Sequence, residues 1–177
     1  MTVTTTDAAG NIGTATNSFT VDSIAPTAPS ITTPSAATSY SGTATPTIGG
    51  TAENNSTVKV YDGATLVATT TASGTGAWSV ATSALSQASH AITATATDAA
   101  GNVSGSSSSK TVVVDTTPPS VSISAPASGA YVTTVTPSVS FSVTETNPGT
   151  STCKFDSNTP VSCASAWTPG KIGRAHV

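Results

Sequence analysis

Hydrophobic and polar residues alternate one by one in short runs along much of the chain. In the segment 57–61 two valines alternate with larger polar residues, and further on Trp78 and Val80 share one face. Such alternation is typical of strands with one buried face, and no segment carries the spacing of an amphipathic helix. The pattern predicts an all-β protein, with strands near residues 29–34, 45–52, 56–62, 65–71, 76–82, 90–97 and 108–114.

The composition leaves disorder as the main alternative to a folded protein. Serine and threonine make up more than a third of the 177 residues. Only 7% of the residues are charged, against about 25% in ordinary soluble domains. Disordered chains combine low hydrophobicity with high net charge, whereas this chain is 36% hydrophobic with a net charge of −3. The alternation therefore favours a folded protein whose surface carries hydroxyl groups rather than ions.

The sequence repeats itself at long range. Asp7–Asn11, which reads Asp-Ala-Ala-Gly-Asn, recurs 91 positions later as Asp98–Asn102. Val21–Pro26 recurs 93 positions later as Val114–Pro119. A unit of this length exceeds one repeat of a solenoid and matches a whole β-sandwich of roughly 100 residues. The repeat therefore predicts sandwiches in tandem, each with its own core.

Proline-containing segments divide the chain. We expect residues 1–22 to be the C-terminal remnant of a preceding repeat, 23–117 a complete domain and 118–170 a truncated third repeat. Residues 171–177 break the composition abruptly, because they hold two of the five basic side chains. Lys-Ile-Gly-Arg-Ala-His-Val is also what the start of a common sequencing adapter encodes. We interpret these seven residues as an adapter artefact and the chain as a fragment of a longer protein.

Charge and motifs exclude several functions. The five basic side chains form no stripe that could neutralise nucleic acid, and no apolar run is long enough to span a membrane. No Gly-x-Ser-x-Gly, phosphate-binding or His-Glu-x-x-His motif occurs, so we expect no enzyme. His90 shares the parity of Ile92 and is expected to pack at a strand edge, while Trp78 is expected in the core.

Five motifs together resemble a known family. In chain order they are Thr-Pro-Thr-Ile-Gly-Gly-Thr-Ala-Glu at 45–53, Thr-Val-Lys-Val-Tyr-Asp-Gly at 57–63, Gly-Ala-Trp-Ser at 76–79, the segment 90–102 that ends in Asp-Ala-Ala-Gly-Asn, and Val-Asp-Thr-Thr-Pro-Pro at 114–119. This order is similar to the bacterial Ig-like repeats of giant secreted adhesins and biofilm proteins. The resemblance implies tandem immunoglobulin-like β-sandwiches, one complete and flanked by two partial repeats.

The resemblance also implies a function. It describes an extracellular or cell-surface segment that holds a distal functional domain away from the cell. Its partners would be the neighbouring Ig-like repeats of the same chain, with an unknown receptor or matrix bound by other domains. Nucleic acid and membrane insertion are not expected for this segment. The alternative is an accessory module of an extracellular carbohydrate-active or proteolytic enzyme, since such enzymes also carry Ig-like repeats.

Acidic side chains are few and fall mostly in predicted turns and linkers. In an Ig-like sandwich the linker at Asp22 and the turns at Glu53 and Asp98 lie at one end, so three carboxylates are expected to meet there. A hard cation with six to eight oxygen ligands would offset their repulsion, and the joints of this family often bind Ca²⁺. Solvated turn formers are the alternative. The predicted metal ligands are Asp22, Glu53, Asp98, Asn102, Asp115 and Glu145.

The two cysteines have the spacing of a hairpin. Cys153 and Cys163 are ten positions apart, on either side of a predicted turn at 156–160. Facing residues of paired strands bring their Cβ atoms within disulfide range. We therefore predict a Cys153–Cys163 disulfide, which suits an oxidising exterior. Two free thiols are the alternative.

Overall fold

The computed structural model describes residues 1–134, 136–154 and 160–164. Regular structure in these residues is β-strand, which confirms the all-β prediction, and none of them forms a helix long and apolar enough to cross a membrane. The chain divides into two units, Met1–Thr116 and Thr117–Val177. The expected adapter segment, 171–177, lies outside the described residues.

The strands follow one another along the chain without intervening helices in the described residues. Their bounds are β1 (Thr2–Thr6), β2 (Ile12–Thr16), β3 (Ser30–Thr33), β4 (Thr38–Ser41), β5 (Thr47–Thr51), β6 (Thr57–Asp62), β7 (Thr65–Thr71), β8 (Ala77–Ala81), β9 (Ser89–Thr97), β10 (Lys110–Val114), β11 (Ser120–Ala125), β12 (Ser140–Thr144), β13 (Thr152–Cys153) and β14 (Val161–Ser162).

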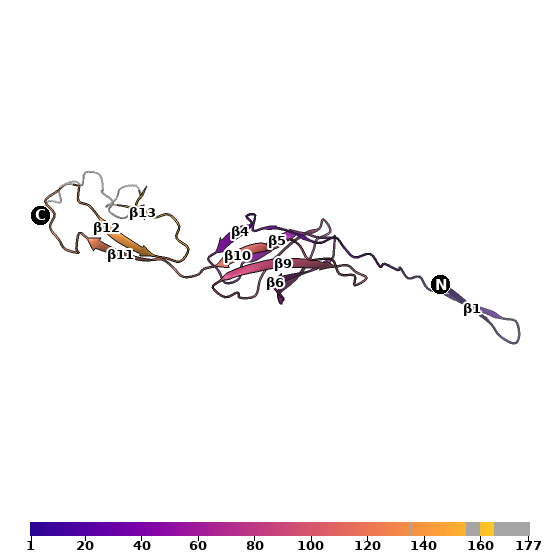
Figure 1. Ribbon diagram of the computed structural model, residues 1–177. Coiled ribbons are helices and arrows are strands. Elements are labelled where there is room, and N and C mark those ends of the chain that lie inside the picture. The colour runs from indigo at the N-terminus through magenta and orange to yellow at the C-terminus, as the bar shows by residue number, and fades with distance from the viewer. Residues whose placement is uncertain (135, 155–159, 165–177) are drawn as a thin grey trace. The chain divides into compact units, whose positions relative to one another are not determined.

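Eight strands of the first unit form a sandwich of two sheets (Figure 1). One sheet has five strands in the order β4-β10-β9-β6-β7, and the other has three in the order β3-β5-β8. Paired strands are antiparallel except β4 and β10, which are parallel. Each sheet turns the alternate apolar residues of its strands toward the other sheet, as a strand period of two requires.

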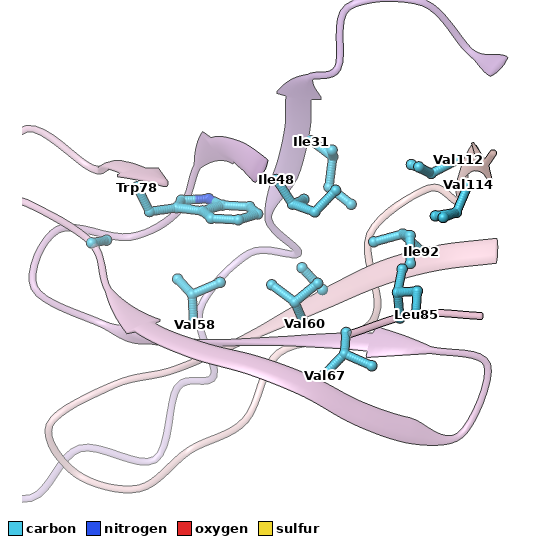
Figure 2. Close-up of a cluster of buried hydrophobic side chains, with 12 residues drawn as sticks. Ile31, Ile48, Val58, Val60, Val67, Trp78, Leu85, Ile92, Val112 and Val114 are labelled. Carbon is cyan, nitrogen blue, oxygen red and sulfur yellow. The ribbon is translucent and has the colours of Figure 1, made fainter. Parts of the chain in front are cut away.

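The hydrophobic core lies between these two sheets (Figure 2). β9 shows the alternation most clearly, because Ile92, Ala94 and Ala96 are fully buried while the threonines between them are half-exposed. Burial of such side chains is the main favourable term in folding. The buried hydrophobic residues are Ile31, Ile48, Val58, Val60, Val67, Ala72, Trp78, Leu85, Ile92, Ala94, Ala96, Val112 and Val114.

β4 is a strand that the hydrophobic pattern missed. Its residues alternate between exposed and half-buried, and the half-buried ones are serines, so no apolar run marks the strand. β4 pairs with β10 and places Tyr40 opposite Val113. As an edge strand it is paired on one side, so backbone hydrogen bonds hold it without a buried face of its own.

Gly50 marks a close approach of β3 and β5, and Gly50→Ala is expected to destabilise the domain. A Cβ atom added at Gly50 would collide with the carbonyl oxygen of Ser30, so β3 would have to shift. Overpacking of this kind costs about 1–3 kcal/mol. Urea unfolding of residues 23–117 measures the loss.

A matched control is Gly42→Ala, because a Cβ added there meets no atom within 4 Å. This variant should change the free energy of unfolding by less than about 0.5 kcal/mol. Equal stability of the two alanine variants would show that β3 does not pack this closely on β5.

The N-terminal segment, residues 1–22, holds the hairpin β1–β2. Its strands are antiparallel, with Val3 opposite Ala15 and Thr4 opposite Thr14, and every residue of both strands is exposed. A two-stranded hairpin is at best marginally stable in water. The segment thus has the secondary structure of a sandwich fragment but no second sheet to pack on.

The described residues of the second unit form two strand pairs, of which the first repeats a pair of the sandwich. β11 pairs with β12 with a register shift between Ile123 and Ala125. β3 pairs with β5 with a shift between Ile31 and Thr33. The two shifts are 92 positions apart, close to the repeat length in the sequence. β13 and β14 form a short antiparallel pair further along the chain.

Candidate functional site

The segment Asp98–Asn102 forms a compact turn at the end of β9. Oδ1 of Asp98 accepts hydrogen bonds from the backbone N–H groups of Ala100 (2.9 Å) and Asn102 (2.8 Å), and Oδ2 accepts one from Nδ2 of Asn102 (2.8 Å). Gly101 has a φ of 95°, which glycine adopts without strain. These hydrogen bonds, with the Asn102 side chain first, lower the pKa of Asp98 against the opposing effect of desolvation.

The same turn occurs at Asp7–Asn11 in the hairpin β1–β2. Oδ1 of Asp7 accepts from the backbone N–H groups of Ala9 and Asn11, each at 2.9 Å, and Oδ2 accepts from Nδ2 of Asn11 at 2.7 Å. The bond from the Asn11 side chain is the main cause that lowers the pKa of Asp7. Since the hairpin packs on no second sheet, the five-residue motif specifies this turn through local hydrogen bonds.

Asn102 also contacts the linker that leads into the sandwich. Its Nδ2 donates to the backbone carbonyl oxygen of Asp22 at 3.2 Å, across 80 positions of sequence. Within the linker, Oδ1 of Asp22 accepts from the backbone N–H of Ile24 at 3.0 Å. The turn and the linker thus form one hydrogen-bonded arrangement, called the joint site below, which consists of Asp22, Ile24, Asp98 and Asn102.

The joint site differs from the one predicted from the sequence. Within residues 1–134, 136–154 and 160–164, no three or more His, Cys, Asp or Glu side chains are grouped to hold a metal ion. The carboxylates of Asp22 and Asp98 accept backbone hydrogen bonds inside their own turns. Glu53 contributes its backbone carbonyl to Ser56 and exposes its side chain. Nearby N–H groups orient the carboxylates of Asp22 and Asp98, and calcium binding stays a prediction.

The two remaining acidic candidates lie outside the joint site. Asp115 follows β10, and its backbone N–H donates to the carbonyl oxygen of Ser41 at 3.0 Å. Glu145 follows β12 in the second unit, where its Oε1 accepts from the backbone N–H groups of Thr146 (2.6 Å) and Asn147 (3.2 Å). By the sequence repeat, Asp115 is the counterpart of Asp22 in the next linker.

A partly buried ion pair joins the end of β6 to the start of β9. His90 is 7% exposed, and its Nδ1 lies 2.7 Å from Oδ2 of Asp62 while its Nε2 lies 2.9 Å from the carbonyl oxygen of Ser86. A carboxylate and a carbonyl are both acceptors, so only a protonated ring, which donates from both nitrogens, satisfies both contacts at once. The Ser86 carbonyl, followed by Asp62, raises the pKa of His90, although desolvation acts in the opposite direction.

The pairing of His90 with Asp62 was not predicted. His90 is buried near the start of β9, as its parity with Ile92 suggests, and there it also forms an ion pair with Asp62. The sequence of β6 could have indicated the pairing, because Asp62 has the same parity as the buried Val58 and Val60. The Asp-Gly turn that follows the strand gave Asp62 a second interpretation, as a turn residue.

A shallow groove runs beside β4 at the edge of the sandwich. It has a volume of about 480 Å³ and no charged side chain among the residues that line it. Tyr40, at 68% exposure, and Pro34, Pro46 and Val112 supply its apolar surface, while serine and threonine hydroxyls supply the rest. The chemistry of this lining suits a neutral ligand.

The two cysteines of the second unit are joined by a disulfide. Cys153 and Cys163 have Cα atoms 5.8 Å apart, at the end of β13 and just after β14. Their strands pair in antiparallel register, with Thr152 opposite Ser162. The bond therefore closes the hairpin at the spacing read from the sequence, and it suits an oxidising environment.

Comparisons relate the chain to known proteins. A family model described as bacterial Ig-like domain matches residues 25–116, just over half of the chain. Among solved structures, the chain is similar to the fibronectin(III)-like modules of Clostridium thermocellum CbhA, with 19% identity and a TM-score of 0.37. That match covers 75% of this chain and 65% of the other, so the chain spans less than two thirds of its length. No curated protein matches the chain.

Proposed function

Because the chain belongs to the bacterial Ig-like domain family, we propose that this segment is a structural extender of a secreted or cell-surface adhesin. In this role it holds a distal functional domain away from the cell. The observation that carries the proposal is the recurrence of one turn geometry, at Asp7–Asn11 in the N-terminal segment and again at Asp98–Asn102 in the complete domain. In the second case the turn binds the linker that precedes its domain.

The neutral surface supports the same role. Four of the five outward residues of β9 carry hydroxyl groups (Ser89, Thr93, Thr95 and Thr97), and only 7% of the whole chain is charged. Hydroxyl groups keep such a surface hydrated, and so few charges leave little electrostatic attraction between neighbouring molecules. An extender at high density on a cell surface needs this property.

An extender is expected to lengthen in equal steps as repeats are added. Tandem proteins of two, three and four copies of residues 25–117 recreate the joint, because Val114-Asp115-Thr116-Thr117 then precedes Ala25-Pro26 as Val21-Asp22-Ser23-Ile24 does here. Small-angle X-ray scattering should give a maximum dimension that rises by a constant increment for each copy. Increments that shrink with each added copy, as in a collapsed or freely jointed chain, would contradict the proposal.

The hydrogen bonds of the joint site stiffen the tandem protein. Asn102→Ala in every copy should therefore shorten the increment in maximum dimension that each copy adds.

We propose in addition that Ca²⁺ stiffens the joint, with the carboxylates of Asp98 and of the linker aspartate as ligands. Millimolar Ca²⁺ should then raise the increment and the melting temperature relative to chelator. Mg²⁺ should substitute poorly, because it demands tighter octahedral geometry. Identical scattering in Ca²⁺ and in chelator would remove calcium from the proposal and leave the extender role in place.

The accessory module of an extracellular carbohydrate-active or proteolytic enzyme is the second candidate. The observation that favours it is the neutral groove beside β4, in which the exposed ring of Tyr40 lies among hydroxyl groups. Aromatic rings and hydroxyl groups are the usual lining of small-ligand sites. Retention of the tandem protein on an insoluble polysaccharide, abolished by Tyr40→Ala, would favour this candidate over the extender.

A further inference from the structure

The complete domain binds both of its linkers through side chains at opposite ends of β9. Asn102, which follows β9, donates from Nδ2 to the backbone carbonyl oxygen of Asp22 in the preceding linker, at 3.2 Å. Gln87, which precedes β9, accepts at Oε1 from the backbone N–H of Thr116 in the following linker, at 3.1 Å. These bonds span 80 and 29 positions of sequence, so they tie each linker to the sandwich itself.

The two bonds act on the same peptide group of the sequence repeat. Asp115 corresponds to Asp22, 93 positions earlier, and Thr116 corresponds in the same way to the residue after Asp22. The peptide group in question joins the linker aspartate to the next residue. In the preceding linker the domain binds the carbonyl oxygen of this group, and in the following linker it binds the N–H.

One peptide group can take part in both bonds at once. In a trans peptide the carbonyl and the N–H point in opposite directions, so two partners approach from opposite sides and do not compete. Each hydrogen bond also polarises the group and strengthens the other bond. A glutamine from the domain before a linker and an asparagine from the domain after it are therefore compatible partners.

Further hydrogen bonds fix the linker backbone next to this peptide group. In the preceding linker, Oδ1 of Asp22 accepts from the backbone N–H of Ile24 at 3.0 Å. In the following linker, the backbone N–H of Asp115 donates to the carbonyl oxygen of Ser41 at 3.0 Å. The peptide group thus has a set direction in both linkers, which two fixed partners require.

We propose that, between successive complete domains, each linker peptide group is held from both sides, by Gln87 of the domain before it and by Asn102 of the domain after it. This two-sided contact, called the linker clamp below, rests on the extender role and explains how one short linker stiffens a joint. Gln87 is then a positioning residue of the joint. Both partners are neutral amides, so the linker clamp does not depend on a bound cation.

The full chain with residues 25–117 present twice in succession tests the linker clamp, because each copy then contains all eight strands of the sandwich. Its central joint takes Gln87 from the first copy and Asn102 from the second. Gln87→Ala in the first copy should raise the hydrogen-exchange rate of the Thr116 amide in that joint about fivefold, the factor for one ordinary hydrogen bond. Asn102→Ala in the second copy should raise the rate of the same amide by a smaller factor, because it weakens the remaining bond.

The same two substitutions in the opposite copies are the matched controls. Gln87→Ala in the second copy and Asn102→Ala in the first copy leave the central joint intact, so its amide should exchange at the unaltered rate. Spin labels on a cysteine in place of the exposed Ser79 in each copy measure the joint as a whole. The distribution of distances between the labels should broaden with the joint substitutions and keep its width with the controls.

Two results would overturn the linker clamp. One is a Thr116 amide whose exchange does not change with Asn102→Ala in the second copy, and the other is an equal effect of each substitution in either copy. Failure of the extender role gives a different result. In that case the scattering increments of the tandem proteins shrink, while the amide of the central joint still responds to both side chains.

Discussion

Trp78→Ala is expected to bring an isolated domain of residues 23–117 close to complete unfolding. Trp78 is 5% exposed and packs in the central cluster of the sandwich. Truncation of a buried tryptophan costs about 3–5 kcal/mol, against a total stability of about 5–15 kcal/mol for a domain. Urea unfolding followed by circular dichroism measures the loss.

The origin of this loss is packing rather than hydrogen bonding. The indole N–H of Trp78 is buried and has no hydrogen-bond partner in the part of the chain that the structure describes. Trp78→Phe should therefore cost much less than Trp78→Ala, because it keeps an aromatic ring and removes an unsatisfied donor. Ser79→Ala, at the exposed neighbouring position, should change stability by less than about 0.5 kcal/mol.

The isolated domain also decides between a sandwich and a disordered chain. Residues 23–117 should show a β-rich spectrum and a single cooperative transition, since they include all eight strands of the sandwich. A featureless spectrum with no transition would contradict the sandwich and favour the disordered alternative.

The sequence predicted the strands that alternate between a buried and an exposed face. β6 and β9 were evident, because their valines, isoleucine and alanines occupy every second position. β4 was not evident, since its alternate positions are serines and its pairing with β10 depends on backbone groups. Hydrophobic periodicity reports burial, so it overlooks a strand that is held by hydrogen bonds alone.

The candidate site was predictable where its bonds are local. The turn at Asp98–Asn102 closes on itself within five residues, and its motif was visible as a repeat. The orientation of the Asp22 and Asp98 carboxylates could not be predicted from the sequence, because nearby backbone N–H groups determine it. The pairing of His90 with Asp62 required the register of β6 and β9, which sets Asp62 opposite Ile92 and thus diagonal to His90.

The stability of the domain is expected to fall as pH rises above about 6.5. Folding raises the pKa of His90 above its ordinary value of 6.5, so the folded state holds a proton that the unfolded state releases. The resulting stabilisation is complete below that value and is lost as pH rises through the raised pKa. Above the raised pKa, the neutral His90 ring donates from only one nitrogen, so its hydrogen bond to Asp62 or to Ser86 is lost.

Melting curves of residues 23–117 between about pH 5.5 and pH 8.5, the range in which histidine titrates, measure this dependence. His90→Leu should lose about 3 kcal/mol at the acidic end, because it leaves the Asp62 carboxylate without its cation, and should flatten the pH dependence. Adding Asp62→Asn should restore part of the loss, since it removes the unpaired charge.

Titration of Asp98 does not affect these curves. Its pKa is lowered from 3.8 in the folded state, so the stability that it contributes is lost only as pH falls below about 3.8. Parallel pH profiles for the unaltered domain and His90→Leu would mean that His90 is neutral in the fold and that one of its two contacts is broken.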